Sequence, residues 1–134
     1  MNIAEPLALY LSLWKSLSPS LSVPFPGPSK SYTHLQSNIS SDQLGRFHIY
    51  ASLYLELTAG RAFNIADVDE DLSWEMVWPG IARYFGLKRV GSEGLRGEEW
   101  VGAKKDKWDA WTSENGLREK VLDNTCWDFM TTVT

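Results

Sequence analysis

The segment "FNIADVDEDLSWEMVWPGIARYFGLKRVG", residues 63 to 91, contains the signals that decide the fold. Residues 61 to 66, "RAFNIA", predict a short strand, and an acidic turn follows at residues 67 to 71. Aromatic and aliphatic residues then recur along one helical stripe from Trp74 to Phe85, and Gly86 suits the left-handed position that ends many helices. A strand, a turn and an amphipathic helix in this order predict an α+β fold.

The acidic turn places carboxylates at alternate positions, as calcium-binding loops do. Such loops also need a glycine at the bend and a glutamate that closes the site, and "DVDED" at residues 67 to 71 is followed by neither. Acidic residues also gather before helices because the helix dipole favours them there. We therefore expect the turn to introduce a helix, and we expect no metal site.

Two more helices are predicted upstream of this segment. Apolar residues recur at helical spacing from about Ala4 to Ser18, on two faces, so this helix should be covered from two sides. A capping box, Ser40-x-x-Gln43, predicts the start of a second helix over about Ser41 to Leu57. Both helices precede the strand and should pack around the same small sheet.

Proline and serine are concentrated in residues 19 to 39, which predicts an ordered loop anchored by Phe25. The tail predicts short helices at Trp108 to Glu114 and Leu117 to Leu122, with a turn near 127 to 130. We expect a single domain, residues 1 to 134, in which short helices pack on a small sheet. That sheet should consist of residues near 23 to 25, 61 to 66 and 88 to 90.

Composition limits the classes of partner. The net charge of −4 argues against a nucleic-acid partner, which needs a basic surface. The apolar run at residues 7 to 14 is too short to span a membrane and lacks the basic start of a signal peptide. Cys126 is the single cysteine and has no internal disulfide partner, which favours a reducing, cytoplasmic setting. A secreted chain with a free thiol is the alternative.

The central segment resembles the C-terminal, substrate-side region of the progesterone 5β-reductase/iridoid synthase-like short-chain dehydrogenases. That family shows a strand with Ala-Phe-Asn, an acidic turn, and then Trp-x-x-x-Trp-Pro-x-(Ile/Leu)-Ala-x-x-Phe-Gly. The segments "LALYLSLWK", "PFPGPSKSY", "LGRFHIYAS" and "CWDFMTTV" are similar to further stretches of the family, so the resemblance spans nearly the whole chain. Seven residues fit the central motif in order: Trp74, Trp78, Pro79, Ile81, Ala82, Phe85 and Gly86.

The departures from the family concern its cofactor. The resemblance implies that the phosphate-binding loop, the catalytic tyrosine and the catalytic lysine precede the region matched here. These 134 residues contain no G-x-G-x-x-G, so no helix start is prepared for a pyrophosphate. The family's Asn-Gly-Asp turn is also replaced by Asp67-Val68-Asp69. We therefore expect the Rossmann nucleotide-binding half to be lacking, no cofactor, and no NAD(P)-dependent reduction by these residues.

Other catalytic sets have little support in the sequence. Two separated histidines, His34 and His48, and one cysteine give no zinc spacing. No Gly-x-Ser-x-Gly elbow supports a serine nucleophile. Cys126, next to a tryptophan, is predicted to be a packed thiol.

Aromatic residues make up 13% of the chain, which predicts a wide apolar pocket or an apolar interface. His48 and Tyr54 are the candidate catalytic residues, because each could donate a hydrogen bond to a bound carbonyl. Packing in the core is the competing interpretation for most of the aromatic residues. The candidate substrate-binding residues are Tyr10, Trp14, Phe47, Trp74, Trp78, Trp127 and Phe129.

Three functions remain open. The favoured one is a cofactor-independent cyclase or isomerase for a hydrophobic natural-product intermediate, such as an intramolecular Diels–Alder catalyst, because an apolar cavity can hold a flexible substrate folded. The second is an accessory or degenerate fragment that docks onto a complete dehydrogenase. The third is a small-molecule binding module without chemistry. A homo-oligomer fits all three, since self-association would cover exposed aromatic surface.

Overall fold

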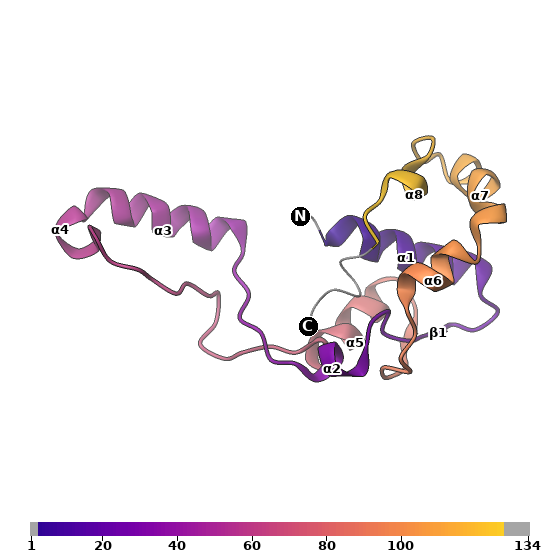
Figure 1. Ribbon diagram of the computed structural model, residues 1–134, viewed down its shortest axis with the longest axis horizontal. Coiled ribbons are helices and arrows are strands. Elements are labelled where there is room, and N and C mark those ends of the chain that lie inside the picture. Colours follow the sequence, from indigo (N-terminus) through magenta and orange to yellow (C-terminus); the bar gives the residue numbers. More distant parts are fainter. Residues whose placement is uncertain (1–2, 128–134) are drawn as a thin grey trace. The chain divides into compact units, whose positions relative to one another are not determined.

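A computed structural model describes residues 3–127 of the chain. The chain divides into two compact units, shown as a ribbon in Figure 1. Unit 1 contains Met1–His34 and Trp74–Thr134, and unit 2 contains Leu35–Ser73. Each unit is described on its own below.

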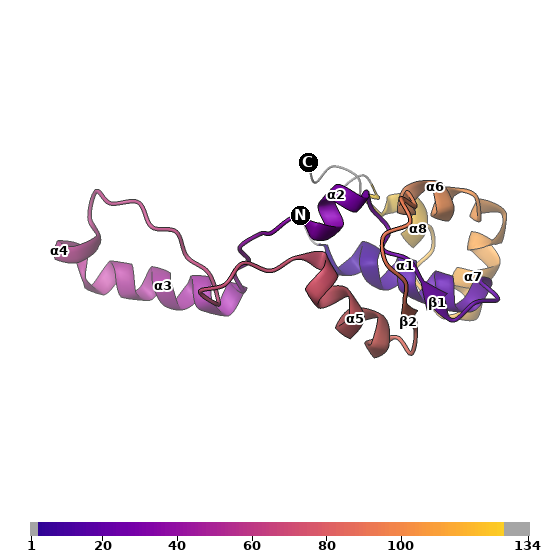
Figure 2. The same cartoon turned by 90° about the horizontal axis from the view of Figure 1, so that it is seen from below.

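The sheet of unit 1 has two short strands, β1 (Ser22–Val23) and β2 (Lys88–Arg89), which pair in parallel (Figure 2). Ser22 lies opposite Lys88, and the ladder continues where the Val90 amide donates to the Val23 carbonyl at 3.0 Å. Short helices around a small sheet confirm the predicted α+β class. The expected strand at residues 61 to 66 is wrong, because these residues lie in unit 2, whose described backbone offers them no paired neighbour.

Helix α1 (Ala4–Leu17) forms the centre of the unit 1 core, and the predicted bounds agree with it to within one residue. Its two apolar flanks are both buried, as expected, with Tyr10, Leu11 and Leu13 fully inaccessible. Phe25 is also buried and anchors the proline-rich segment, in which α2 (Ser29–Thr33) provides one helical turn that the sequence did not suggest. Burying this many large side chains is the main source of stability for a unit of this size.

Helix α5 (Trp74–Tyr84) packs against β2 and α2 (Figure 2). Gly86 follows it with φ of +73°, the left-handed conformation that the sequence predicted. The Lys15 ammonium of α1 donates to the Phe85 carbonyl at 2.9 Å and so satisfies one of the acceptors at the end of α5. This contact joins two helices that are far apart in sequence.

The C-terminal part of unit 1 contains α6 (Gly97–Gly102), a 3₁₀ turn (Lys105–Lys107), α7 (Trp108–Glu114) and α8 (Val121–Asn124). The prediction for α7 is confirmed. The helix predicted at 117 to 122 begins only at Val121, because Gly116 and Lys120 both adopt positive φ and break the backbone. The turn predicted near 127 to 130 lies mostly outside the described residues.

Unit 2 consists of α3 (Ser41–Leu53), α4 (Leu55–Thr58) and the chain that returns beside α3 (Figure 1). The single helix predicted from 41 to 57 is interrupted at Tyr54, whose backbone is not helical (φ −119°, ψ 57°). The Thr58 hydroxyl lies 2.8 Å from the Ala51 carbonyl and 2.9 Å from the Tyr54 carbonyl, so it stabilises the bend.

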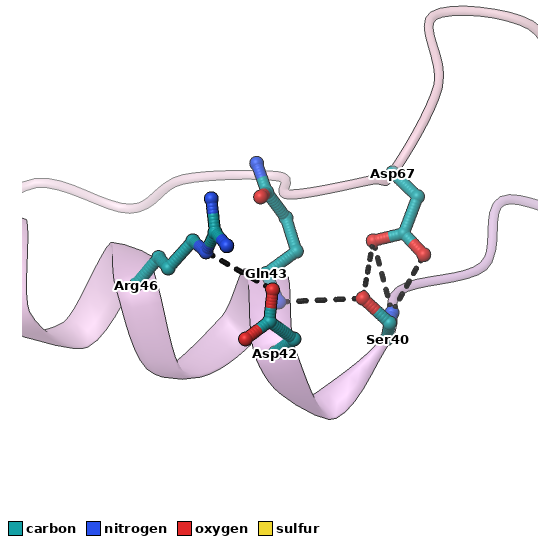
Figure 3. Close-up of polar contacts among 5 residues, drawn as sticks. All are labelled: Ser40, Asp42, Gln43, Arg46 and Asp67. Carbon is teal, nitrogen blue, oxygen red and sulfur yellow. Dashed lines mark hydrogen bonds and ion pairs between the residues drawn. The ribbon is translucent and has the colours of Figure 1, made fainter.

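The start of α3 is tied to the acidic turn (Figure 3). The Ser40 hydroxyl accepts from the Gln43 amide at 3.3 Å, as the capping box predicts. The Ser40 amide and hydroxyl both donate to the Asp67 carboxylate, at 3.0 and 2.9 Å. The Ser37 hydroxyl donates to the Asp71 carboxylate, and the Gln36 and Leu72 backbones form an antiparallel bridge beside it. The carboxylates of Asp67 and Asp71 thus connect the acidic turn to the segment that precedes α3.

Candidate functional site

An apolar groove of about 540 Å³ runs along unit 1 between α1 and α5. Trp74, Ile81 and Phe85 line it from α5, at the spacing of one helical stripe. The volume lies within the range of roughly 300–1,000 Å³ that small-molecule pockets usually occupy. The remaining lining residues are Ile3, Ala4, Leu7, Ala8, Leu11, Gly80 and Tyr84.

Small residues create the width of this groove. Ala4 and Ala8 lie one turn apart on α1, and Gly80 lies on α5 with no atom within 4 Å of the position its Cβ would take. Large side chains at these positions would fill the space between the helices. Of the groove residues, Trp74 alone was a candidate in the sequence, and the sequence offered no separate signal for the others.

An aromatic cluster in unit 1 includes Trp74. The Phe25 ring centroid lies 5.5 Å from that of Trp74, 5.6 Å from that of Trp78 and 5.2 Å from that of Tyr32. Trp78 is fully buried, and neither its indole N–H nor the Tyr32 hydroxyl has a hydrogen-bond partner within the described part of the chain. These two donors are unusual, because most buried polar groups in folded proteins are paired.

A second aromatic cluster joins α1 to α6. Trp14 packs on Trp100 with ring centroids 4.6 Å apart, and Tyr10 contacts Trp100 edge-on at 5.8 Å. The Tyr10 hydroxyl donates to the Pro24 carbonyl at 3.1 Å, and the Trp14 indole donates to the Ser22 carbonyl at 3.1 Å. Burial, with a smaller contribution from the negative charge of Glu93, raises the pKa of Tyr10 above its usual value, so this phenol stays neutral.

Unit 2 contains the two predicted catalytic residues, both on its surface. The His48 ring lies on α3, and its Nδ1 is 2.8 Å from the Leu44 carbonyl. A carbonyl oxygen only accepts, so Nδ1 carries the proton and Nε2 is the nitrogen that would accept one. Tyr54 is 45% exposed, and its ring stacks on Tyr50 at 4.7 Å, while Phe47 packs on Phe63 at 5.2 Å.

The remaining candidates lie at the end of the chain. Trp127 is half-buried, and its indole donates to the Leu122 carbonyl at 3.0 Å, which attaches it to α8. Phe129 lies outside the described residues. Among the candidates, unit 1 therefore brings Tyr10 together with Trp14 at 5.8 Å, and it links Trp74 and Trp78 through Phe25. A pocket shared by all predicted residues, including Phe47, His48 and Tyr54, stays a prediction.

Neither a metal site nor a membrane span is found in residues 3–127. No three histidine, cysteine or acidic side chains there gather closely enough to hold a metal ion. No helix in this described range has the length and apolar character needed to cross a bilayer.

Comparison with known protein families identifies the class to which this chain belongs. The PRISE-like Rossmann-fold domain family matches residues 1–125. The chain therefore belongs to this family, and the resemblance to progesterone 5β-reductase-like short-chain dehydrogenases is confirmed.

Individual relatives carry related names. The chain is 35% identical to "Short chain dehydrogenase ausT" of Aspergillus calidoustus, covering 93% of this chain and 32% of that protein. It is 29% identical to "Short chain dehydrogenase sirQ" of Leptosphaeria maculans, covering 96% of this chain and 33% of that protein. It is also 29% identical to "3-oxo-Delta(4,5)-steroid 5-beta-reductase" of Arabidopsis thaliana, covering 92% of this chain and 31% of that protein. The chain thus spans about a third of the length of these curated relatives.

Proposed function

We propose that this chain binds a hydrophobic, carbonyl-bearing small molecule, a natural-product intermediate, in the groove between α1 and α5. The groove is the observation that carries the proposal, because it combines a ligand-sized volume with an almost entirely apolar lining. The Arabidopsis relative supports the ligand class, since its name describes a steroid with a 3-oxo group. The chain would then contribute the substrate-side part of a short-chain-dehydrogenase-type protein.

The catalytic form of this proposal is a cofactor-independent cyclisation or isomerisation. A groove that holds a flexible polyene or enone in a folded conformation lowers the entropic cost of ring closure. A Diels–Alder cyclisation needs no net proton transfer, whereas an isomerisation would take a proton from one carbon and return it to another. His48 and Tyr54 of unit 2 stay the catalytic residues proposed from the sequence alone, His48 as a proton carrier and Tyr54 as a hydrogen-bond donor to a carbonyl. The single cysteine supports placing this activity in the cytoplasm.

One observation favours a second candidate function. The chain matches about a third of relatives that are named as dehydrogenases, so its groove could present substrate to a nucleotide-binding part supplied by another protein. In this case the chain binds the ligand but catalyses nothing without that protein. Adding a complete dehydrogenase with NADPH distinguishes the two, because the second function predicts no turnover by the chain alone and a rate in the mixture above that of the dehydrogenase alone.

Binding to the groove can be tested with a matched pair of glycine substitutions. Gly80→Leu places a large side chain in the groove, whereas Gly45→Leu places the same side chain on α3 in unit 2. Both glycines have free space where a side chain would begin, so neither substitution creates a clash at its Cβ. We expect a 3-oxo-Δ4-steroid to bind the unmodified chain saturably in equilibrium dialysis. Gly80→Leu should weaken binding about tenfold or more, and Gly45→Leu should not change it. Equal affinity of all three proteins would contradict the proposal.

A further inference from the structure

A lysine lies at one end of the apolar groove between α1 and α5. Leu11 lines the groove from α1, and Phe85 lines it from the end of α5. Lys15 follows Leu11 by one turn of α1, so both side chains start on the same face of that helix. The Lys15 ammonium donates to the Phe85 carbonyl at 2.9 Å, which places a positive charge directly beside a groove residue. All three residues belong to unit 1, so the arrangement is internal to that unit.

The ammonium is held in place but is not neutralised. A Cβ at Gly86 would lie 3.2 Å from the Lys15 ammonium, so the glycine leaves room for this group. The ion pairs found within residues 3–127 do not include Lys15. An ammonium has three N–H donors, and the Phe85 carbonyl takes one of them. The other donors can serve a ligand.

The neighbouring charges do not cancel that of Lys15. Glu5, ten residues earlier on α1, lies 3.8 Å from the Arg118 guanidinium, which balances its charge. Glu75 and Arg83 of α5 do not line the groove. The end of α5 contributes the partial negative charge of the helix dipole, about half an elementary charge, which the full charge of the ammonium exceeds. The Leu11–Phe85 end of the groove is therefore electropositive.

We propose that the groove binds an amphipathic acid, whose hydrophobic body fills the groove and whose carboxylate pairs with Lys15. This inference rests on the proposed function and names the chemical class of its ligand. The support is complementarity, because an apolar lining with one cation at its end matches an apolar molecule with one anion at its end. Hydrogen bonds between an ammonium and a carboxylate are stronger than neutral ones, and an apolar wall strengthens them further.

The same geometry orients the ligand and favours a carboxylate over a phosphate. The acid group lies at the Leu11–Phe85 end, and the body extends along α1 toward Ile3. Eight residues separate Ile3 from Leu11, which corresponds to roughly 12 Å of helix and suits the length of a steroid. Phosphate sites use several donors or the start of a helix, whereas one ammonium beside the end of a helix offers less.

A matched pair of ligands tests the inference on the unmodified chain. The first is a 3-oxo-Δ4-steroid with a 17β-carboxylic acid, and the second is its primary carboxamide, which has a similar shape but no charge. In equilibrium dialysis at low salt, the acid should bind about tenfold more tightly than the amide. Added sodium chloride should reduce this preference, because it screens the charges.

The outcomes separate this inference from the proposed function. Saturable binding of both ligands with equal affinity overturns the inference and leaves the proposed function intact. Binding of neither ligand overturns both. A preference for the acid that sodium chloride does not reduce also overturns the inference, because an ion pair with Lys15 depends on ionic strength.

Variants of Lys15 assign the preference to this residue. Lys15→Met removes the charge and should weaken binding of the acid about tenfold while leaving the amide unchanged, and Lys15→Arg should keep the preference. The matched control is Lys107→Met, in the 3₁₀ turn of unit 1, which does not line the groove and should change neither affinity. Circular dichroism checks that each variant folds.

A merely structural role of Lys15 would give a different result. If Lys15 only supported the end of α5, Lys15→Met would weaken both ligands equally, and this outcome overturns the inference. Loss of the acid preference in Lys107→Met would show an unspecific effect of net charge and overturns it as well. The comparison of acid and amide on the unmodified chain does not depend on the folding of any variant.

Discussion

At the scale of single residues, Tyr10 illustrates why an aromatic residue in the sequence cannot be assigned to core or pocket by its type. It was a candidate for substrate binding, and the structure gives its hydroxyl a backbone acceptor, the Pro24 carbonyl, at 3.1 Å. The ring is fully inaccessible, and burial together with the charge of Glu93 raises the pKa of this phenol. The sequence contains no local signal for a contact that spans this distance along the chain.

Tyr10→Phe should lower the free energy of unfolding by about 1–2 kcal/mol, because it leaves the Pro24 carbonyl without its donor. Urea denaturation at neutral pH measures this change. An unchanged midpoint would show that the hydrogen bond is not formed.

The raised pKa of Tyr10 also predicts a pH dependence. The unfolded chain ionises near the usual tyrosine pKa of about 10, and the folded chain ionises at higher pH. The contribution to stability is therefore complete below pH 10 and is lost as pH rises, by up to about 1.4 kcal/mol per pH unit. Comparing the unmodified chain with Tyr10→Phe removes the contribution of other groups, and the variant should lose stability less steeply above pH 10. Parallel curves would contradict the assignment.

Trp74 and Trp78 should respond differently to truncation, although both belong to the same helical stripe. Trp78 is fully buried, so Trp78→Ala should cost about 3–5 kcal/mol through the cavity it creates. Trp74 is partly open to the groove, so Trp74→Ala should cost less stability and weaken ligand binding more. Thermal unfolding together with equilibrium dialysis gives both quantities. Equal losses of stability would place Trp74 in the core.

At the scale of elements, helix ends were the most predictable feature of the chain. Gly86 after α5 and Ser40 before α3 occupy their predicted roles because caps depend on a few neighbouring residues. In a complete capping box the Gln43 side chain also accepts a hydrogen bond from the Ser40 amide. Here the Ser40 amide donates instead to the carboxylate of Asp67, which lies far along the chain.

Gly86 and Gly80 provide a matched test of the end of α5. Gly86→Ala should destabilise the chain by about 1 kcal/mol, because alanine disfavours φ of +73° and its Cβ would lie 3.2 Å from the Lys15 ammonium. Gly80→Ala lies inside the helix with free space around it and should stabilise by roughly 0.5–1 kcal/mol. Chemical denaturation of both variants is the measurement. The same sign for both would contradict the assigned roles of the two glycines.

The errors in the predicted elements share a physical cause. Residues 61 to 66 have the composition of a strand but lie in unit 2, where no neighbouring strand completes a ladder. Residues 41 to 57 have a continuous helical pattern in the sequence, but the helix is interrupted at Tyr54. There the Thr58 hydroxyl lies within hydrogen-bond distance of the Ala51 and Tyr54 carbonyls. Pairing and bending depend on distant or competing partners, which local periodicity does not encode.

At the scale of the whole molecule, family and fold class could be predicted from the sequence, whereas the groove could not. The motif from Trp74 to Gly86 was specific enough to indicate the PRISE-like family, which matches residues 1–125. The groove is lined by the small residues Ala4 and Ala8 of α1 and Gly80 of α5, among larger apolar side chains. Small residues carry little pattern of their own, and tertiary packing alone gives them this role.

These 134 residues should not bind NADPH, because no G-x-G-x-x-G is present to form a phosphate-binding turn. A titration followed by tryptophan fluorescence tests this expectation. Saturable quenching at micromolar NADPH would contradict it and would favour a reductase over a cofactor-independent enzyme.

Photoaffinity labelling with a diazirine derivative of a 3-oxo-Δ4-steroid, followed by peptide mass spectrometry, tests the central claim most directly. The groove between α1 and α5 predicts labels in residues 3 to 11 and 74 to 85, with labelling suppressed by excess steroid and by Gly80→Leu. Labels confined to other segments, or labels within these segments that Gly80→Leu leaves unchanged, would contradict the assignment of the groove as the ligand site.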